Sequence, residues 1–171
     1  ASALRGAVEG ARDGRIMAAK TDISEALSFL DGKRGEMAAT LERWCAVNTG
    51  SYNLEGLAAM RDALEAAFGA LGPVETVACP PQQVVTAAGE TVAREVGASL
   101  RLIVRPEAPV RVLLAGHMDT VFAADHAFQR GRYLDADTYN APGAADMKGG
   151  LLVMLYALKA VETSPLASRI G

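Results

Sequence analysis

The sequence predicts an α/β fold in which helices flank a central mixed sheet. Apolar residues recur at spacings of three and four in the first 70 residues, and short runs rich in β-branched residues follow in the middle of the chain. The first pattern is typical of amphipathic helices and the second of strands. A nearly all-apolar helical stretch comes last, so the order of elements fits an α/β or α+β arrangement with the sheet built from the middle of the chain.

The composition is that of one globular domain. The 171 residues are 50% hydrophobic and 22% charged, which is enough apolar content for a core. The formal net charge is −3, so no basic field draws the chain to nucleic acid or to anionic lipid. No apolar run approaches the ~20 residues of a membrane span. Cys45 and Cys79 form neither a CxxC pair nor a disulfide framework, which favours a cytoplasmic protein.

The first half of the chain predicts an N-terminal arm and two helices. Residues 1–28 are small, polar and charged and are expected to form the arm, in which Ser24 could cap a short helix. Asn53 is a good N-cap for a longer helix that ends at the Gly-Pro of residues 72–73. The helix between them carries an apolar stripe of Met37, Leu41, Trp44, Cys45 and Asn48.

The middle of the chain predicts short strands. Residues 74–78, 100–104 and 110–114 have strand character, and the Pro-rich residues 105–109 predict a hairpin or tight connection between the last two. The long connection that follows contains another expected strand near Tyr133. Residues 149–161 are apolar nearly all round, so we expect a helix that is covered on most sides.

Two short motifs next to these elements carry the candidate chemistry. GHMDT at residues 116–120 follows an apolar strand, and GAADMKGG at residues 143–150 opens the last helix. His117 lies where functional groups gather in open α/β sheets, and a neutral imidazole is a good zinc ligand. Asp119 could be a second ligand, or it could accept the other imidazole N–H and fix the tautomer. Asp146 lies near a helix N-terminus, where a carboxylate is favoured and could bridge two cations.

Each of these residues also has a purely structural interpretation. A histidine after a strand is often only a hydrogen-bonded residue, and Asp119 or Asp146 alone could be a turn or helix-cap residue. The two glycines at residues 149–150 argue against an ordinary helix start, because together they cost roughly 1–2 kcal/mol relative to alanine. They are understandable if the backbone packs closely beneath a site. The combination therefore predicts a metal site.

The motifs resemble those of the M20 metallopeptidase family, which includes glutamate carboxypeptidases, acetylornithine deacetylases and aminoacylases. The similarity rests on LLAGHMDTVF at residues 113–122 and APGAADMKGG at residues 141–150, and it is greatest to the glutamate carboxypeptidase, or carboxypeptidase G2-like, branch. The resemblance implies that His117 binds one zinc ion, that Asp119 is the acidic residue that orients it, and that Asp146 bridges two zinc ions. It also implies a cis peptide bond after Asp146.

The resemblance further implies groups that this sequence does not contain. The family has an adjacent Glu-Glu pair, one member a general base and the other a zinc ligand, as well as another carboxylate and a second histidine. This sequence has no adjacent acidic pair, only Glu162 as an acid after Asp146, and no histidine after His126. We therefore expect residues 29–171 to be the N-terminal half of a catalytic domain, without the lid and dimerisation domain, and to be inactive alone.

The complete enzyme implied by this resemblance is a zinc-dependent hydrolase. It is expected to hold two zinc ions, with cobalt or manganese as possible substitutes, and to cleave amide bonds of small peptides or N-acyl amino acids. Its other expected partners are the remainder of its own chain and a second copy in a homodimer, with no nucleic acid and no membrane.

Two other interpretations of the whole chain stay open. The first is a non-catalytic fragment or pseudo-enzyme module that binds a partner through an uncovered sheet edge and an apolar helix. The second is an unrelated α/β domain with a chance motif. Among the remaining polar residues, His126 matches no family ligand, and Lys148 is interpreted as a solvated or supporting group rather than a chemical one. Asp135 and Asp137 are interpreted as turn residues.

Overall fold

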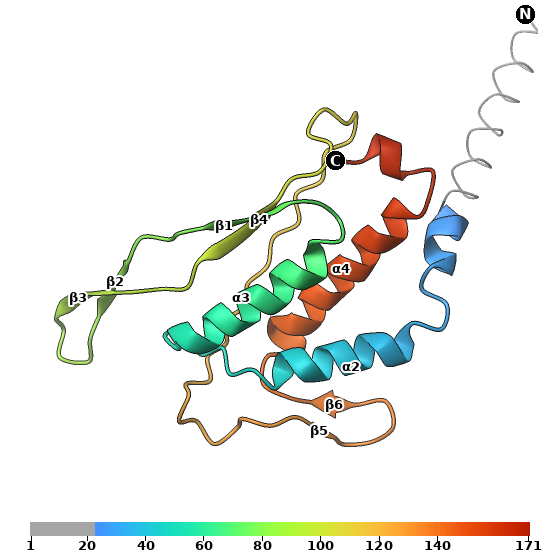
Figure 1. The fold of residues 1–171 in the computed structure, drawn as a ribbon. Coiled ribbons are helices and arrows are strands. Elements are labelled where there is room, and N and C mark those ends of the chain that lie inside the picture. The colour runs from blue at the N-terminus through green and yellow to red at the C-terminus, as the bar shows by residue number, and fades with distance from the viewer. Residues whose placement is uncertain (1–22) are drawn as a thin grey trace, which may run out of the picture.

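The computed structural model describes residues 23–171 and has the mixed α/β composition that the sequence predicts. Three helices lie together, and the strands extend to one side of them and beneath them (Figure 1). The helices are α2 (Arg34–Cys45), α3 (Leu54–Phe68) and α4 (Gly149–Glu162). Most of the predicted N-terminal arm lies outside the described residues, although residues 23–28 form the short helix expected there.

The helices form where the apolar spacing places them, and their buried faces make the core. Asn53 caps α3 as predicted, because its side-chain oxygen accepts the amide N–H of Gly56 at 3.2 Å. None of the helices among residues 23–171 is long and apolar enough to cross a bilayer. The core cluster combines side chains from α2, α3 and α4: Trp44, Met60, Leu64, Leu151, Leu152, Leu155 and Tyr156.

The helix α4 is covered on most sides, as predicted, and one stripe of it is exposed. Val153 is 60% exposed, and Ala157, one turn later on the same face, is exposed as well. The other residues from 149 to 161 are buried or half-buried.

The strands form three separate antiparallel pairs, joined by two isolated parallel bridges. The strand predicted at residues 74–78 is confirmed, and its partner is the strand predicted near residue 100. The pairs are β1 (Val74–Val77) with β4 (Ser99–Leu102), β2 (Gln82–Val85) with β3 (Thr91–Arg94), and β5 (Arg132–Tyr133) with β6 (Tyr139–Asn140). The hairpin of β2 and β3 extends away from the helices in Figure 1 and was not predicted.

The predicted strand at residues 110–114 and its hairpin with residues 100–104 were wrong. A strand needs a partner along its length, and β4 pairs with β1 instead. Only the start of the segment pairs, through a parallel bridge between Val110 and Ile170 and a 2.8 Å hydrogen bond from the Val112 amide to the Gly171 carbonyl. Beyond this bridge the backbone is irregular, and Leu113 is 90% exposed.

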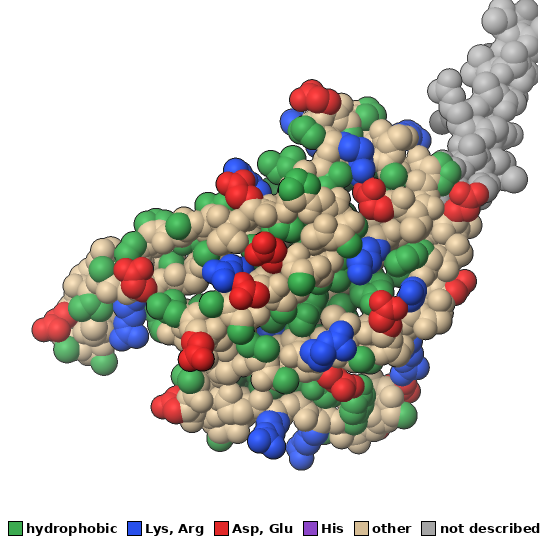
Figure 2. Space-filling view, viewed as in Figure 1, with side chains coloured by type: hydrophobic (Ala, Val, Ile, Leu, Met, Phe, Trp, Pro, Cys, Tyr) green, Lys and Arg blue, Asp and Glu red, His purple; other side chains and the backbone are tan. Residues whose placement is uncertain are grey.

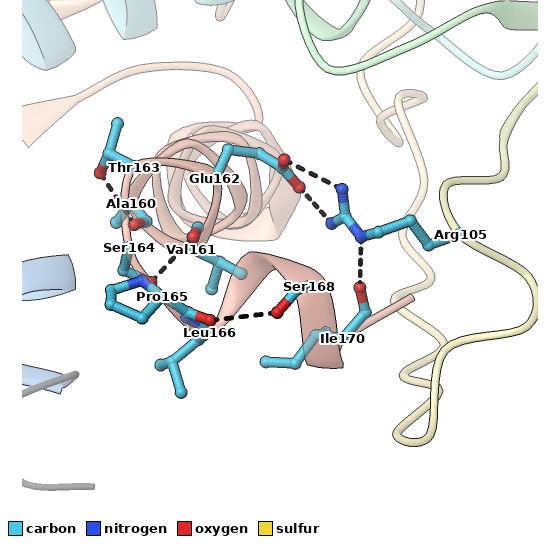
Figure 3. Close-up of polar contacts among 10 residues, drawn as sticks. All are labelled: Arg105, Ala160, Val161, Glu162, Thr163, Ser164, Pro165, Leu166, Ser168 and Ile170. Carbon is cyan, nitrogen blue, oxygen red and sulfur yellow. Dashed lines mark hydrogen bonds and ion pairs between the residues drawn. The ribbon is translucent and has the colours of Figure 1, made fainter. Parts of the chain in front are cut away.

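A group of polar contacts at the end of α4 anchors the beginning of this segment (Figure 3). The guanidinium of Arg105 donates to both carboxylate oxygens of Glu162, and its Nε donates to the carbonyl of Ile170 at 2.8 Å. One side chain thus joins the turn after β4, the last residue of α4 and the end of the described chain. The extended segment that leads to His117 starts from this anchor.

The surface carries acidic and basic side chains in mixed order. On the face shown in Figure 2, red and blue side chains alternate, with no large patch of one sign. This distribution agrees with the small net charge of the sequence.

Candidate metal centre

The loop that carries His117 is pinned to the loop between α2 and α3. Thr120 forms a parallel bridge with Gly50, in which the Thr120 amide donates to the Thr49 carbonyl at 2.8 Å and the Ser51 amide donates to the Thr120 carbonyl at 3.1 Å. A Cβ on Gly50 would lie 2.6 Å from the carbonyl oxygen of Phe122, so the two backbones approach as closely as they do only because this residue is glycine.

The surroundings of the His117 ring place an oxygen acceptor at each of its nitrogen atoms. Nδ1 lies 3.0 Å from the carbonyl oxygen of Asp119 and 3.2 Å from its carboxylate Oδ1. Nε2 lies 3.0 Å from Oδ1 of Asp146. A neutral ring has one N–H and can donate on one side only, and the tautomer with its hydrogen on Nδ1 leaves a lone pair on Nε2.

Asp146 reaches His117 because it lies in an irregular turn before α4. The segment η1 (Ala144–Lys148) follows Gly143, which has a φ of 72°, and Asp146 has φ −134° and ψ 93°, outside the helical region. The peptide bond between Asp146 and Met147 is cis, as the resemblance implied. The alternative of an ordinary helix cap is not observed, since Lys148 occupies the N-cap position of α4.

The contact between His117 and Asp146 needs a positive charge. A nitrogen lone pair and a carboxylate oxygen 3.0 Å apart repel each other unless a proton or a metal ion lies between them. Partial burial lowers the pKa of His117, but the hydrogen bonds to Asp146 and to the Asp119 carbonyl, together with both carboxylate charges, outweigh it and raise the pKa above its ordinary value. Without metal, a proton on Nε2 supplies this charge.

The donor set also fits a zinc ion. An imidazole nitrogen and a carboxylate oxygen are among the ligands that zinc takes in proteins, and catalytic sites have three protein ligands. Within residues 23–171, no group of three or more His, Cys, Asp and Glu side chains converges as metal ligands would. Among the described residues, His117 and Asp146 could hold a metal ion, but they are fewer than the ligands of a catalytic zinc site.

Ser51 is a site residue that the sequence interpretation missed. Its hydroxyl donates to Oδ2 of Asp119 at 2.6 Å, so the carboxylate that faces Nδ1 is itself held in place. The only signal in the sequence was a cluster of small and polar residues at 48–53, which is equally typical of an ordinary loop.

The ligand atoms face a hollow of about 310 Å³. His117 and Asp146 line one part of it, and Phe122 and Phe128 line another. These two rings pack edge to face with their centroids 5.1 Å apart. His126 lies against Phe122 in this aromatic group, and its Nδ1 accepts the Phe128 amide at 3.0 Å, so its ring has a local structural role.

The loop that carries the aromatic residues is fixed by two side-chain amides. Asn48 donates to the carbonyl of Phe122 at 3.1 Å and to the side chain of Gln129 at 2.8 Å. Gln129 in turn donates to the carbonyl of Ala123 at 2.9 Å. The wall of the hollow is therefore held by hydrogen bonds to the loop between α2 and α3, which also holds the His117 loop.

Three other predicted residues have clear positions. Lys148 is 0% exposed, so the interpretation as a solvated lysine was wrong, whereas a supporting role stays open. Burial lowers the pKa of its ammonium group. Asp135 and Asp137 lie in the turn between β5 and β6, where the Asp135 side chain accepts the Asp137 amide at 2.8 Å, as predicted for turn residues.

Comparison with known sequences finds one family model that covers both motifs. Residues 113–169 match the sequence model of peptidase family M20/M25/M40, and this range contains His117, Asp119 and Asp146. This third of the chain is therefore similar to M20 peptidases. The chain is also similar to carboxypeptidase G2 of Pseudomonas sp. (strain RS-16), with 29% identity over 123 residues. That alignment covers 72% of this chain and 27% of the relative, so the chain spans about a quarter of the relative's length.

Proposed function

We propose that His117 and Asp146 form one side of a dinuclear zinc site in a hydrolase of amide bonds. The observation that carries the proposal is the 3.0 Å approach of His117 Nε2 to a carboxylate oxygen of Asp146. The match of residues 113–169 to the M20/M25/M40 peptidase model and the similarity to a protein named carboxypeptidase G2 support the reaction class. The proposed substrates are small peptides or N-acyl amino acids.

Each residue of this site has a separate role in the proposal. His117 offers a neutral nitrogen whose direction is set by the Nδ1 contacts with Asp119, and Ser51 holds the Asp119 carboxylate. The Asp146 side chain is 86% exposed, so its second oxygen can reach a second cation while the first faces His117. A divalent ion bound there supplies a Lewis acid for the scissile carbonyl and for water.

The hollow beside the ligands suits a small substrate. Ligand pockets commonly have volumes of about 300–1,000 Å³, and this one lies at the lower end of that range. Its aromatic and aliphatic wall can receive an apolar substrate group while the amide approaches His117 and Asp146. The general base and further ligands are expected from residues other than 23–171.

The test is metal-dependent hydrolysis by the full chain that contains these residues. N-acetyl amino acids, folate-type glutamyl amides and dipeptides are offered before and after chelation and with zinc restored. We expect chelation to abolish turnover, zinc to restore it, and His117→Ala and Asp146→Asn to lower kcat/KM by at least ~10³-fold. The control Asp125→Asn, on an exposed residue, should retain activity. Turnover that survives chelation, or that Asp146→Asn does not affect, would contradict the proposal.

A second candidate function is partner binding without catalysis. The exposed apolar residues Leu113 and Val121, at 90% and 89%, favour it, because such residues mark interaction surfaces when they cluster. A full chain that hydrolyses none of the panel with zinc, cobalt or manganese would favour this alternative.

A further inference from the structure

Lys148 is the largest fully buried side chain of the described residues, and its ammonium group binds backbone rather than a carboxylate. Nζ donates to the carbonyl of Trp44 at 3.0 Å and to the carbonyl of Val47 at 2.8 Å. Lysine is almost never fully buried unless it is paired, and an apolar side chain of similar length would fill the same volume without desolvating a charge. Its presence calls for a role that packing alone does not supply.

Trp44 lies in the last turn of α2, and Val47 is two residues beyond the end of this helix. The negative end of the helix dipole favours a cation there. The Trp44 carbonyl also accepts the Val47 amide at 3.3 Å, so the ammonium group is its second hydrogen-bond partner. Lys148 reaches the two carbonyls from 104 and 101 positions away in the chain, and its ammonium group therefore attaches η1 to the end of α2 and to the loop that follows.

Lys148 is also the last residue of η1, only two residues after Asp146. Its backbone amide donates to the carbonyl of Gly143 at 2.8 Å. A Cβ on Gly143 would lie 3.3 Å from Cδ of Lys148, so the lysine stem runs directly beneath the turn that leads to Asp146. The side chain thus supports η1 from below and connects it to α2.

Asp146 itself has few contacts that could fix its direction. Its backbone dihedrals are not helical, and its side chain is 86% exposed. Its contact with a described side chain is the one to Nε2 of His117. The position of the Asp146 carboxylate therefore depends on the position of the η1 backbone.

We propose that Lys148 is a positioning residue, which places the Asp146 carboxylate opposite His117 by clamping η1 to the carbonyls of Trp44, in the last turn of α2, and Val47, in the loop that follows. This inference rests on the proposed function, because it concerns the geometry of the metal ligands. Lys148 acts through the backbone and touches neither the metal nor the substrate.

The test compares Lys148→Met with the wild type in the full chain. Methionine has a similar length and no donor, so it removes the clamp with little change in volume. The readouts are the zinc Kd, measured by competition with a chelating indicator, the absorption spectrum of the cobalt-substituted protein, and the circular dichroism and Tm of the metal-free protein. The matched control is Lys159→Met, which removes a lysine from the following helix, α4, at a position over the Tyr156 ring.

We expect Lys148→Met to keep the fold, to raise the zinc Kd about tenfold or more, and to change the cobalt spectrum. Lys159→Met should leave the zinc Kd within about twofold. A folded Lys148→Met protein with wild-type zinc affinity and an unchanged cobalt spectrum would overturn the proposal, even if its Tm were lower. Such a result would show that the lysine only stabilises the fold.

A second variant covers the case in which Lys148→Met does not fold. Lys148→Gln keeps an amide donor in a shorter side chain. We expect its zinc Kd to lie between that of the wild type and the tenfold higher Kd expected when both hydrogen bonds to Trp44 and Val47 are lost. If Lys148→Gln also fails to fold, Lys148 is a folding residue and the proposal is overturned. If the wild-type chain itself binds no zinc, the proposed function fails instead, so the two failures are distinguishable.

Discussion

Replacement of Asp119 by asparagine tests whether this carboxylate supports His117 as a metal ligand. The change removes one negative charge and keeps the size of the side chain. The carboxylate Oδ1 lies 3.2 Å from Nδ1 of the ring, and its other oxygen accepts the Ser51 hydroxyl. We expect weaker zinc binding, because the charge that stabilises a metal-bound imidazole is lost.

The size of the effect follows from the distance and the exposure. Two unit charges 3.2 Å apart interact by about 1.3 kcal/mol at the dielectric constant of water, which is an upper limit because a neutral imidazole bound to zinc carries only part of the metal's charge. The water value applies because the side chains of His117 and Asp119 are 47% and 41% exposed. Since 1.4 kcal/mol is about a factor of ten, Asp119→Asn should raise the zinc Kd by up to about tenfold. The Asp119 backbone carbonyl still accepts Nδ1–H, so binding should weaken without being abolished.

The assay is zinc competition on the full chain at constant pH and ionic strength. Asp125→Asn is the matched control, since it makes the same charge change on an exposed residue of the following loop. Ser51→Ala should raise the Kd only a few-fold, because it frees the Asp119 carboxylate without removing its charge. Wild-type affinity in Asp119→Asn, or an equal loss in Asp125→Asn, would refute the reasoning.

Three further predictions concern pH and stability. Because the pKa of His117 is raised, a proton competes for Nε2, and zinc affinity measured by calorimetry should fall about tenfold per pH unit below that pKa. Burial and the hydrogen bond to Glu36 raise the pKa of Tyr156 to about 12, so this stabilisation is complete below about pH 10 and is lost between about pH 10 and 12. The difference between the absorbance titrations of the wild type and Tyr156→Phe at 295 nm should show one phenol that ionises at about pH 12. In urea unfolding at neutral pH, Tyr156→Phe should lower the free energy of unfolding by about 1 kcal/mol. Gly143→Ala combines a φ of +72° with a Cβ 2.7 Å from a threonine methyl, so urea unfolding should show a loss of about 2 kcal/mol or more. In the control Gly89→Ala, φ is +80° but the Cβ meets nothing within 4 Å, and the loss should be about 1 kcal/mol.

The helices were predictable because each is determined locally. The buried face of α3 repeats at the helical period, and the cap at Asn53 acts over three residues. Strand pairing is different, because it depends on which distant segment lies alongside. Residues 110–114 have the composition of a strand, yet only their first residues meet a partner, at Ile170. Half of the residues in β2 and β3 are polar and most are exposed, so the apolar signal of this hairpin was weak.

The candidate site was predictable to the extent that its residues lie in two short motifs. His117, Asp119 and Asp146 could be named from the sequence, although their roles stay predictions. Ser51 could not, since its contact with Asp119 spans 68 residues. The burial of Lys148 was equally hidden, because a lysine in a sequence is normally interpreted as solvated.

The parallel bridge between Gly50 and Thr120 has a consequence for how the site assembles during folding. The two bridged residues are 70 positions apart in the chain, and the hydrogen bonds of Lys148 join segments more than 100 positions apart. Contacts of such separation require closure of long loops before they contribute to stability, so they tend to slow folding. We therefore expect the ligand pair to form late, after the helices have associated. Zinc should then slow unfolding of the native protein more than it accelerates folding, which stopped-flow refolding with and without zinc would measure.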